Sequence, residues 1–379
     1  MRDLTLGERL KRANWLLLAM GGALALFGVV LVEVASRGES TRAAFDQVRW
    51  TVIGVTGCLL VMAVPYERIV RWRYALYALG VLMLLATLVI GVGGGGSDVR
   101  RWIRVGGFKV QPSEFMKIIM VITLAGYLRY ETSHREFKGL TVPFILTFAP
   151  MILIVKQPDL GTALLLIPLL FVLLYVAGAR PRHLVPVAFA GVLVGVLLYV
   201  VEGPLNEYQR DRVRAFAYQD SGHPALLRGK GHQLHNSKMV VGSATFFGVG
   251  TGEEAEESVH FLSQRHTDFI FPVMVATFGT FGASLYLVFF LLFIWVLLQT
   301  AARVREPSGR LLIVGVATVF VCQALINMAM TVGLLPVVGM PLPFISKGGS
   351  SLLTGFLALG LVLNVGADHP VEFGRSDFD

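Results

Sequence analysis

The sequence predicts an all-α fold, a polytopic transmembrane helical bundle of about ten spans. Of its 379 residues, 55% are hydrophobic and only 15% are charged, and the mean hydropathy is +0.67. Soluble domains carry roughly 25% charged residues. Apolar runs of roughly 20 residues recur along the chain, long enough to cross a bilayer as helices. We therefore treat residues 1–379 as a single integral membrane domain.

We expect the spanning segments at about 13–34, 46–64, 72–92, 114–128, 139–155, 160–177, 183–201, 269–298, 310–333 and 350–366. The first follows a basic N-terminal stretch, as a signal peptide would, but it is too long for a typical h-region. We expect it to be retained as a helix. The segment 269–298 is longer than a bilayer requires. Either it is kinked, with Pro272, Gly279 and Gly282 as candidates, or its first turns stand outside the bilayer.

Ten spans would place both termini on the same side of the membrane. Short basic connections fall on that side, at 68–73, 129–138, 180–182 and 303–310. Positive charge in short loops marks the cytoplasm, so we expect cytoplasmic termini. Residues 202–268 then form a large extracytoplasmic loop between spans seven and eight, and Asp268 faces outward.

The short outer loop 93–112 breaks the charge rule. It carries one acid, Asp98, and four bases: Arg100, Arg101, Arg104 and Lys109. An anionic ligand such as a phosphate at the outer leaflet would account for this excess. A solvated face, or pairing with the acidic run 253–257, would account for it equally well.

The stretch from Arg265 to Asp268 carries a base, an imidazole, a hydroxyl and a carboxylate at the border between the polar loop and the apolar run 269–298. A carboxylate beside hydrocarbon is costly, which makes Asp268 a functional candidate. Aspartate is also a common N-cap, so Asp268 capping a helix that begins at Phe269 is the alternative.

Another polar cluster opens the fourth predicted span. Pro112 and Ser113 indicate a helix start, with Ser113 as the expected cap. Glu114 and Lys117 are spaced i, i+3 on one helical face, so they can form an ion pair. We favour a structural role for this pair over direct participation in chemistry.

Two more clusters lie at outer ends of predicted spans. The turn 156–162 contains Asp159, which would either cap the next helix or bring a second carboxylate to a site. A Pro- and Gly-rich segment ending at Ser350 indicates non-helical backbone at the membrane border, which is tolerated only inside protein or beside water. The amides of Gly348, Gly349 and Ser350 would bind an anion or form a plain turn and cap.

These motifs together resemble the SEDS family (shape, elongation, division and sporulation). The resemblance covers nearly the whole chain and rests on five motifs in order: Arg101-Trp102, Gln111 to Glu114, Gln157 to Thr162, His266 to Phe271, and Pro341 to Ser351. Among the branches, the sequence is more similar to RodA of elongation than to FtsW of division. It departs from the family pattern at Ser263-Gln264 and at Lys347, where Tyr is common.

The resemblance implies a peptidoglycan glycosyltransferase of the bacterial cytoplasmic membrane that polymerises lipid II, with a class B penicillin-binding protein as partner and no nucleic acid. The key carboxylate of the family matches Asp268, its loop tryptophan matches Trp102, and its paired acid and base match Glu114 and Lys117. A lipid flippase or a non-catalytic scaffold of the elongation complex remains the alternative, since both would share the spans and the outer charges.

For an inverting transfer from a lipid pyrophosphate, we predict Asp268 as the general base. The predicted substrate-binding residues are Arg101, Trp102, Arg210, His266 and Lys117, and the predicted structural or supporting residues are Glu114, Asp159 and Ser350. No carboxylate-rich metal cage is visible in the sequence, although pyrophosphate chemistry could recruit a divalent cation. Membrane lipids are the remaining expected partner.

Overall fold

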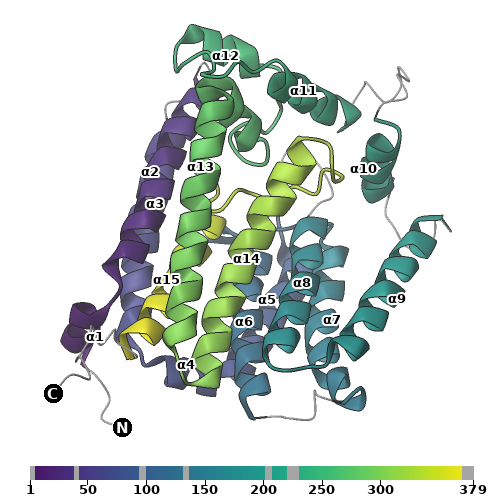
Figure 1. The fold of residues 1–379 in the computed structure, drawn as a ribbon. Coiled ribbons are helices and arrows are strands. Elements are labelled where there is room, and N and C mark those ends of the chain that lie inside the picture. The colour runs from purple at the N-terminus through teal and green to yellow at the C-terminus, as the bar shows by residue number, and fades with distance from the viewer. Residues whose placement is uncertain are drawn as a thin grey trace.

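The computed structural model describes residues 5–37, 42–93, 100–130, 136–200, 207–219 and 230–368. These residues form a helical bundle (Figure 1). Its α-helices are α1 (Leu6–Arg12), α2 (Trp15–Ser36), α3 (Arg42–Ala63), α4 (Tyr66–Arg71), α5 (Arg73–Ile90), α6 (Pro112–Tyr130), α7 (Thr141–Lys156), α8 (Leu160–Val176), α9 (Pro181–Val200), α10 (Glu207–Ala217), α11 (Lys230–Gly242), α12 (Glu253–Val259), α13 (Ile270–Arg303), α14 (Pro307–Thr331) and α15 (Gly349–Asp368).

A helix lies at each of the ten predicted spans, with ends that differ from the prediction by a few residues. Within the described ranges, six helical stretches are long and apolar enough to cross a membrane: α2, α5, α7 with the turn before it, α13, α14 and α15. The apolar helix α8 is shorter. The helical membrane bundle is therefore confirmed, and the count of ten crossings stays a prediction.

One element corrects the all-α prediction, an antiparallel hairpin inside the loop 93–112. Its strands are β1 (Ile103–Val105) and β2 (Phe108–Val110), with Ile103 opposite Val110. Gly106 and Gly107 form the two-residue turn and both have positive φ, 54° and 86°. That is the backbone of a type I′ turn, which glycine adopts without strain and which matches the twist of a hairpin.

The two ends of the bundle differ. Helices α10, α11 and α12, all within the predicted extracytoplasmic loop 202–268, gather at one end, and α1 and α4 lie at the other (Figure 1). Arg9 of α1 is buried, bonds to Asn364 and lies 3.2 Å from Asp368 at the end of α15. The first and last described helices thus meet at one end, as an even number of spans requires. Which end faces the cytoplasm stays a prediction.

Helix α13 is broken at Gly279, one of the predicted kinks. Gly279 has φ 69° and ψ −172°, and a Cβ there would lie 2.2 Å from the carbonyl oxygen of Phe246. The loop 245–250 fills the break, since Val249 N donates to Ala276 O at 3.0 Å and Thr280 N donates to Thr245 O at 3.2 Å. Residues 270–278 are mostly buried, and the exposed large apolar side chains of α13 begin after the break, at Phe281. The start of α13 therefore lies within protein.

Candidate functional site

A polar cavity of about 920 Å³ opens among the elements at the α10–α11 end of the bundle. Its walls come from α3, the β1–β2 hairpin, α10, α11, the turn before α13 and the chain that leads into α15. Segments distant in sequence meet here. Of the residues predicted to form a site, the lining includes Asp268, Arg101, Trp102, His266, Glu114 and Ser350.

The turn before α13 presents Asp268 to this cavity. Gln264 has φ 56°, and its carbonyl accepts hydrogen bonds from Thr267 N at 3.1 Å and Phe269 N at 3.3 Å. The N-cap of α13 is Phe269, with no side-chain cap hydrogen bond. Asp268 therefore precedes the cap position, and its side chain is partly buried and faces the cavity. This geometry does not support a capping role for Asp268.

The turn before α13 is held by Asn327 of α14 and by the non-helical segment 332–348, which lies within the predicted Pro- and Gly-rich stretch. The side-chain Nδ2 of Asn327 donates to the backbone carbonyl oxygens of Asp268 at 2.9 Å and Met340 at 2.6 Å. Ser346 Oγ donates to Thr267 O at 2.7 Å, and Lys347 N donates to His266 O at 2.8 Å. Because the bonds go to backbone carbonyls, they fix the turn while leaving the Asp268 side chain in the cavity.

Gly339 in this segment lies against the Asp268 carboxylate. It has φ 76°, and a Cβ at this position would stand 3.2 Å from Asp268 Oδ2 and 3.7 Å from Arg212 Nη1. Only glycine combines this backbone conformation with such close approach at low cost.

We expect Gly339→Ala to reduce activity by about tenfold or more. The added methyl group strains the backbone and displaces the Asp268 carboxylate from its position in the cavity. Steady-state rates of the purified variant test this. Gly106→Ala is the matched control, since Gly106 has φ 54° but its Cβ would meet nothing within 4 Å and it does not line the cavity. Equal losses in both variants would point to general backbone strain instead.

Two arginines act on the Asp268 carboxylate. Burial raises the pKa of Asp268, Arg212 of α10 and then Arg101 lower it, and Asp159 adds a smaller upward effect. The net direction is upward, so Asp268 holds its proton more tightly than an exposed aspartate. Arg101 is itself anchored, because its Nε donates to Gln157 O at 3.2 Å and its Nη2 donates to Pro158 O.

Arg210 is the predicted substrate-binding arginine of the basic loop, whereas the cavity lining contains Arg212 and not Arg210. Both residues lie on α10, two positions apart, and positions i and i+2 of a helix face in different directions. Arg265 is also directed elsewhere, since it is 3% exposed and donates to the carbonyls of Ala35 and His260. The basic charge of the loop predicted an arginine in this region. The rotation of α10 about its own axis determines that this arginine is Arg212 and not Arg210.

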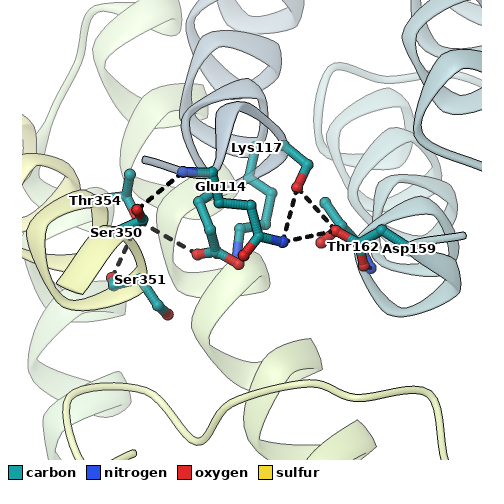
Figure 2. A network of polar contacts seen from close by, with 9 residues as sticks. Glu114, Lys117, Asp159, Thr162, Ser350, Ser351 and Thr354 are labelled. Carbon is teal, nitrogen blue, oxygen red and sulfur yellow. Dashed lines mark hydrogen bonds and ion pairs between the residues drawn. The ribbon is translucent and has the colours of Figure 1, made fainter. Parts of the chain in front are cut away.

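The predicted Glu114–Lys117 pair is confirmed. Lys117 Nζ lies 2.8 Å from Glu114 Oε2, and the two side chains are only 2% and 4% exposed. Thr354 Oγ1 of α15 approaches the same carboxylate oxygen at 3.5 Å (Figure 2). Lys117 is therefore buried beside Glu114 and does not line the cavity, whereas Glu114 does line it.

Asp159 and Ser350 join three helices beside this pair (Figure 2). Asp159 is the N-cap of α8 and accepts from Thr162 N at 3.3 Å, and it also accepts from Ser113 Oγ at 2.8 Å. Ser350 Oγ accepts from Gln111 N at 3.0 Å. The cap interpretation of Asp159 is thus supported. The prediction of Ser113 as a cap is wrong, because α6 already begins at Pro112 and Ser113 bonds across to Asp159.

The remaining predicted residues lie in the first outer loop and the turn. Trp102 pairs with Val92 through backbone bonds of 2.7 and 3.2 Å, which tie the loop to the end of α5, and its side chain lines the cavity. Of the four loop bases, Arg101 and Lys109 line the cavity, whereas Arg100 donates to Val89 O at 3.3 Å. Within the described part of the chain, no three His, Cys, Asp or Glu side chains gather as metal ligands. Divalent-cation assistance stays a prediction.

Fold and site together define a multi-pass membrane protein with a cation-lined cavity that contains the partly buried carboxylate of Asp268. A family model described as "Cell cycle protein", covering FtsW, RodA and SpoVE, matches residues 8–369. The chain belongs to this family, which is the SEDS family of the sequence analysis, and is an integral bacterial membrane protein.

Relatives and solved structures agree with this. The chain is 32% identical over 369 residues to a probable peptidoglycan glycosyltransferase FtsW of Trichlorobacter lovleyi, covering 95% of this chain and 94% of the relative. It is 32% identical to stage V sporulation protein E of Bacillus subtilis, over 90% and 93% of the two chains.

A solved peptidoglycan synthase complex, described as coordinating polymerization and crosslinking, contains a chain similar to this one. The TM-score is 0.80 at 28% identity, with 94% of this chain and 98% of that chain covered. The rod shape determining protein RodA of Thermus thermophilus gives a TM-score of 0.70 at 25% identity, over 94% and 97%.

Proposed function

We propose that this chain polymerises the glycan strands of peptidoglycan, transferring a lipid-pyrophosphate-linked disaccharide-peptide (lipid II) with inversion and with Asp268 as general base. Its membership of the family and its relatives named peptidoglycan glycosyltransferase support the enzyme class. The observation that carries the mechanism is the carboxylate of Asp268, which faces the cavity beside Arg101 and Arg212, whereas the other lining carboxylate, Glu114, is paired with Lys117.

The chemistry needs a proton acceptor and a stabilised leaving group. Asp268 takes the proton of the attacking sugar hydroxyl as the new C–O bond forms at the anomeric carbon of the donor. The bond from that carbon to the phosphate oxygen breaks, and the lipid pyrophosphate leaves with the electron pair. Arg101 and Arg212 stabilise the charge that develops there. A raised pKa makes Asp268 a stronger base than an exposed aspartate, provided that it is deprotonated at the working pH.

A flippase and a scaffold remain the competing functions. Neither needs a carboxylate with a raised pKa beside two cations in one cavity, because neither makes or breaks a bond. The arrangement at Asp268 is typical of catalytic groups. This observation favours the enzyme.

The experiment that tests the function is reconstitution of the purified chain in liposomes with labelled lipid-linked disaccharide. We expect labelled polymer that separates by size from the precursor. Label that crosses the bilayer and stays monomeric would indicate a flippase. Label that neither crosses nor polymerises would indicate a scaffold.

The partner and the branch are proposed on similarity. The chain similar to this one in a peptidoglycan synthase complex supports a class B penicillin-binding protein as the partner here, recoverable by co-purification from native membranes. The elongation branch rests on the sequence motifs, and the similar relatives carry both division and sporulation names. Rescue of cells depleted of their elongation member, but not of cells depleted of their division member, would assign the branch.

A further inference from the structure

The cavity is lined by more cationic side chains than Arg101 and Arg212, the two that act on Asp268. Its lining includes Arg49, Arg101, Lys109, Arg212 and Lys347 against the acids Glu114 and Asp268. Glu114 is already neutralised by Lys117 behind the wall. Like charges in one cavity repel each other, and this repulsion is relieved when an anion binds.

The cations fall into two groups. Arg212 lies with the Asp268 carboxylate around Gly339, and Arg212 and Arg101 are the cations that lower the pKa of Asp268. The second group, which we call the hairpin cluster, consists of Arg49 of α3, Lys109 of β2 and Lys347 just before α15. Among the described residues, Lys109 and Lys347 form no ion pair, and Arg49 pairs with Asp46 at 3.1 Å on an exposed surface, where such pairs are weak.

The backbone around the hairpin cluster is locked in place. The Trp50 ring lies so close to Gly349 that a Cβ there would be 2.2 Å from it. Phe108 meets this ring edge-on at 5.4 Å, and the Arg49 guanidinium lies 5.4 Å over the Phe108 ring. These contacts fix α3, β2 and the start of α15 relative to one another.

Two hydrogen bonds complete this frame. Ser350 Oγ donates to Lys109 O at 3.4 Å, and Lys347 N donates to His266 O at 2.8 Å. The first ties the hairpin to α15, and the second ties Lys347 to the turn that carries Asp268. The backbone that carries the three cations is therefore fixed in position, and it is bonded to the turn before α13 that carries Asp268.

We infer that the hairpin cluster is a second anion-binding subsite, for the pyrophosphate of the acceptor. This rests on the proposed function. A reaction between two lipid-linked saccharides brings two pyrophosphates into one cavity. The donor pyrophosphate is bonded to the attacked carbon, so it belongs beside Asp268, Arg101 and Arg212. The acceptor attacks with the sugar at the far end of its disaccharide, so its pyrophosphate lies away from the base.

The test measures the initial rate at which label from a donor with a blocked attacking hydroxyl is transferred to an unlabelled acceptor, so that acceptors reacting with one another are not counted. The acceptor is supplied in three forms: complete, without phosphate, and with pyrophosphate but without peptide. We expect Lys347→Gln to raise KM for the complete acceptor roughly 5- to 10-fold, the scale of one charged contact in a partly exposed site. This rise in acceptor KM should persist for the acceptor without peptide and disappear for the acceptor without phosphate. The values of kcat and of the donor KM should not change.

Lys156→Gln is the matched control, because Lys156 is exposed, adjoins Gln157 near the cavity-lining Arg101, and does not itself line the cavity. Lys347→Arg keeps the charge and should restore KM. Lys109→Gln should reproduce the effect if Lys347→Gln does not fold. A rise in KM that survives removal of phosphate would overturn the inference.

Two other results would also overturn the subsite. A rise that vanishes only when the peptide is removed would assign the cations to a peptide carboxylate, and a rise in donor KM would place them at the leaving group. If the wild type forms no bond at all, the proposed function fails. A normal wild type with an unaffected Lys347→Gln variant refutes the second subsite alone.

Discussion

We expect Asp268→Asn to lower the rate of polymerisation by about 10²–10⁴-fold, the usual contribution of a general base. Asparagine keeps the size of the side chain but cannot accept the proton. The fold should persist, because the bonds that hold this turn run through backbone carbonyls and the side chain makes no cap hydrogen bond. Initial rates on labelled lipid-linked disaccharide measure the effect.

Glu254→Gln provides the control, since it removes an exposed carboxylate from α12 without touching the cavity. It should polymerise at the wild-type rate. A near-normal rate for Asp268→Asn would show that Asp268 is not the general base, because asparagine cannot accept the proton. Thermal unfolding of both variants checks that neither loses its structure.

The second large effect is expected at Arg212. Replacing it by Gln removes a cation that acts on the Asp268 carboxylate and, in the proposed mechanism, on the leaving pyrophosphate. Losing one such stabilising group typically costs about 10²–10³-fold in kcat. Because Arg212 lowers the pKa of Asp268, its removal raises that pKa further, so the acid side of the pH–rate profile should move to higher pH.

The control for this variant lies on the same helix. Arg214→Gln removes the same charge from an exposed position of α10 that does not line the cavity. It should leave both the rate and the pH profile unchanged. An equal loss in Arg214→Gln and Arg212→Gln would show that the net charge of α10 matters and the position of Arg212 does not.

The helices and much of the cavity could be predicted from the sequence because their signals are local. Long apolar runs determine the spans, and the excess length of the run 269–298 made Gly279 one of three candidate kinks, of which the structure breaks the helix at Gly279. The i, i+3 spacing of Glu114 and Lys117 predicted their ion pair, since spacing on one helix fixes which side chains meet. Motif order then placed Asp268, Arg101 and Trp102 in one region.

Other features depend on how distant segments pack. The choice between Arg210 and Arg212 follows from the rotation of α10, which its neighbours set and its own sequence does not. The hairpin was missed because it lies in a short polar loop, although Gly106-Gly107 between alternating apolar residues is a recognised turn signal. The hairpin cluster of Arg49, Lys109 and Lys347 joins three segments, and no local pattern predicts that meeting.

The most direct test of Asp268 as the base is the pH dependence of single-turnover transfer in the wild type and in Asp268→Asn. The wild-type rate should fall as the pH drops through a pKa above that of an exposed aspartate, because burial raises the pKa of Asp268 and protonation removes the base. The small residual rate of Asp268→Asn should lack this acid limb. If the same limb persists in the variant, another group accepts the proton and Asp268 is not the base.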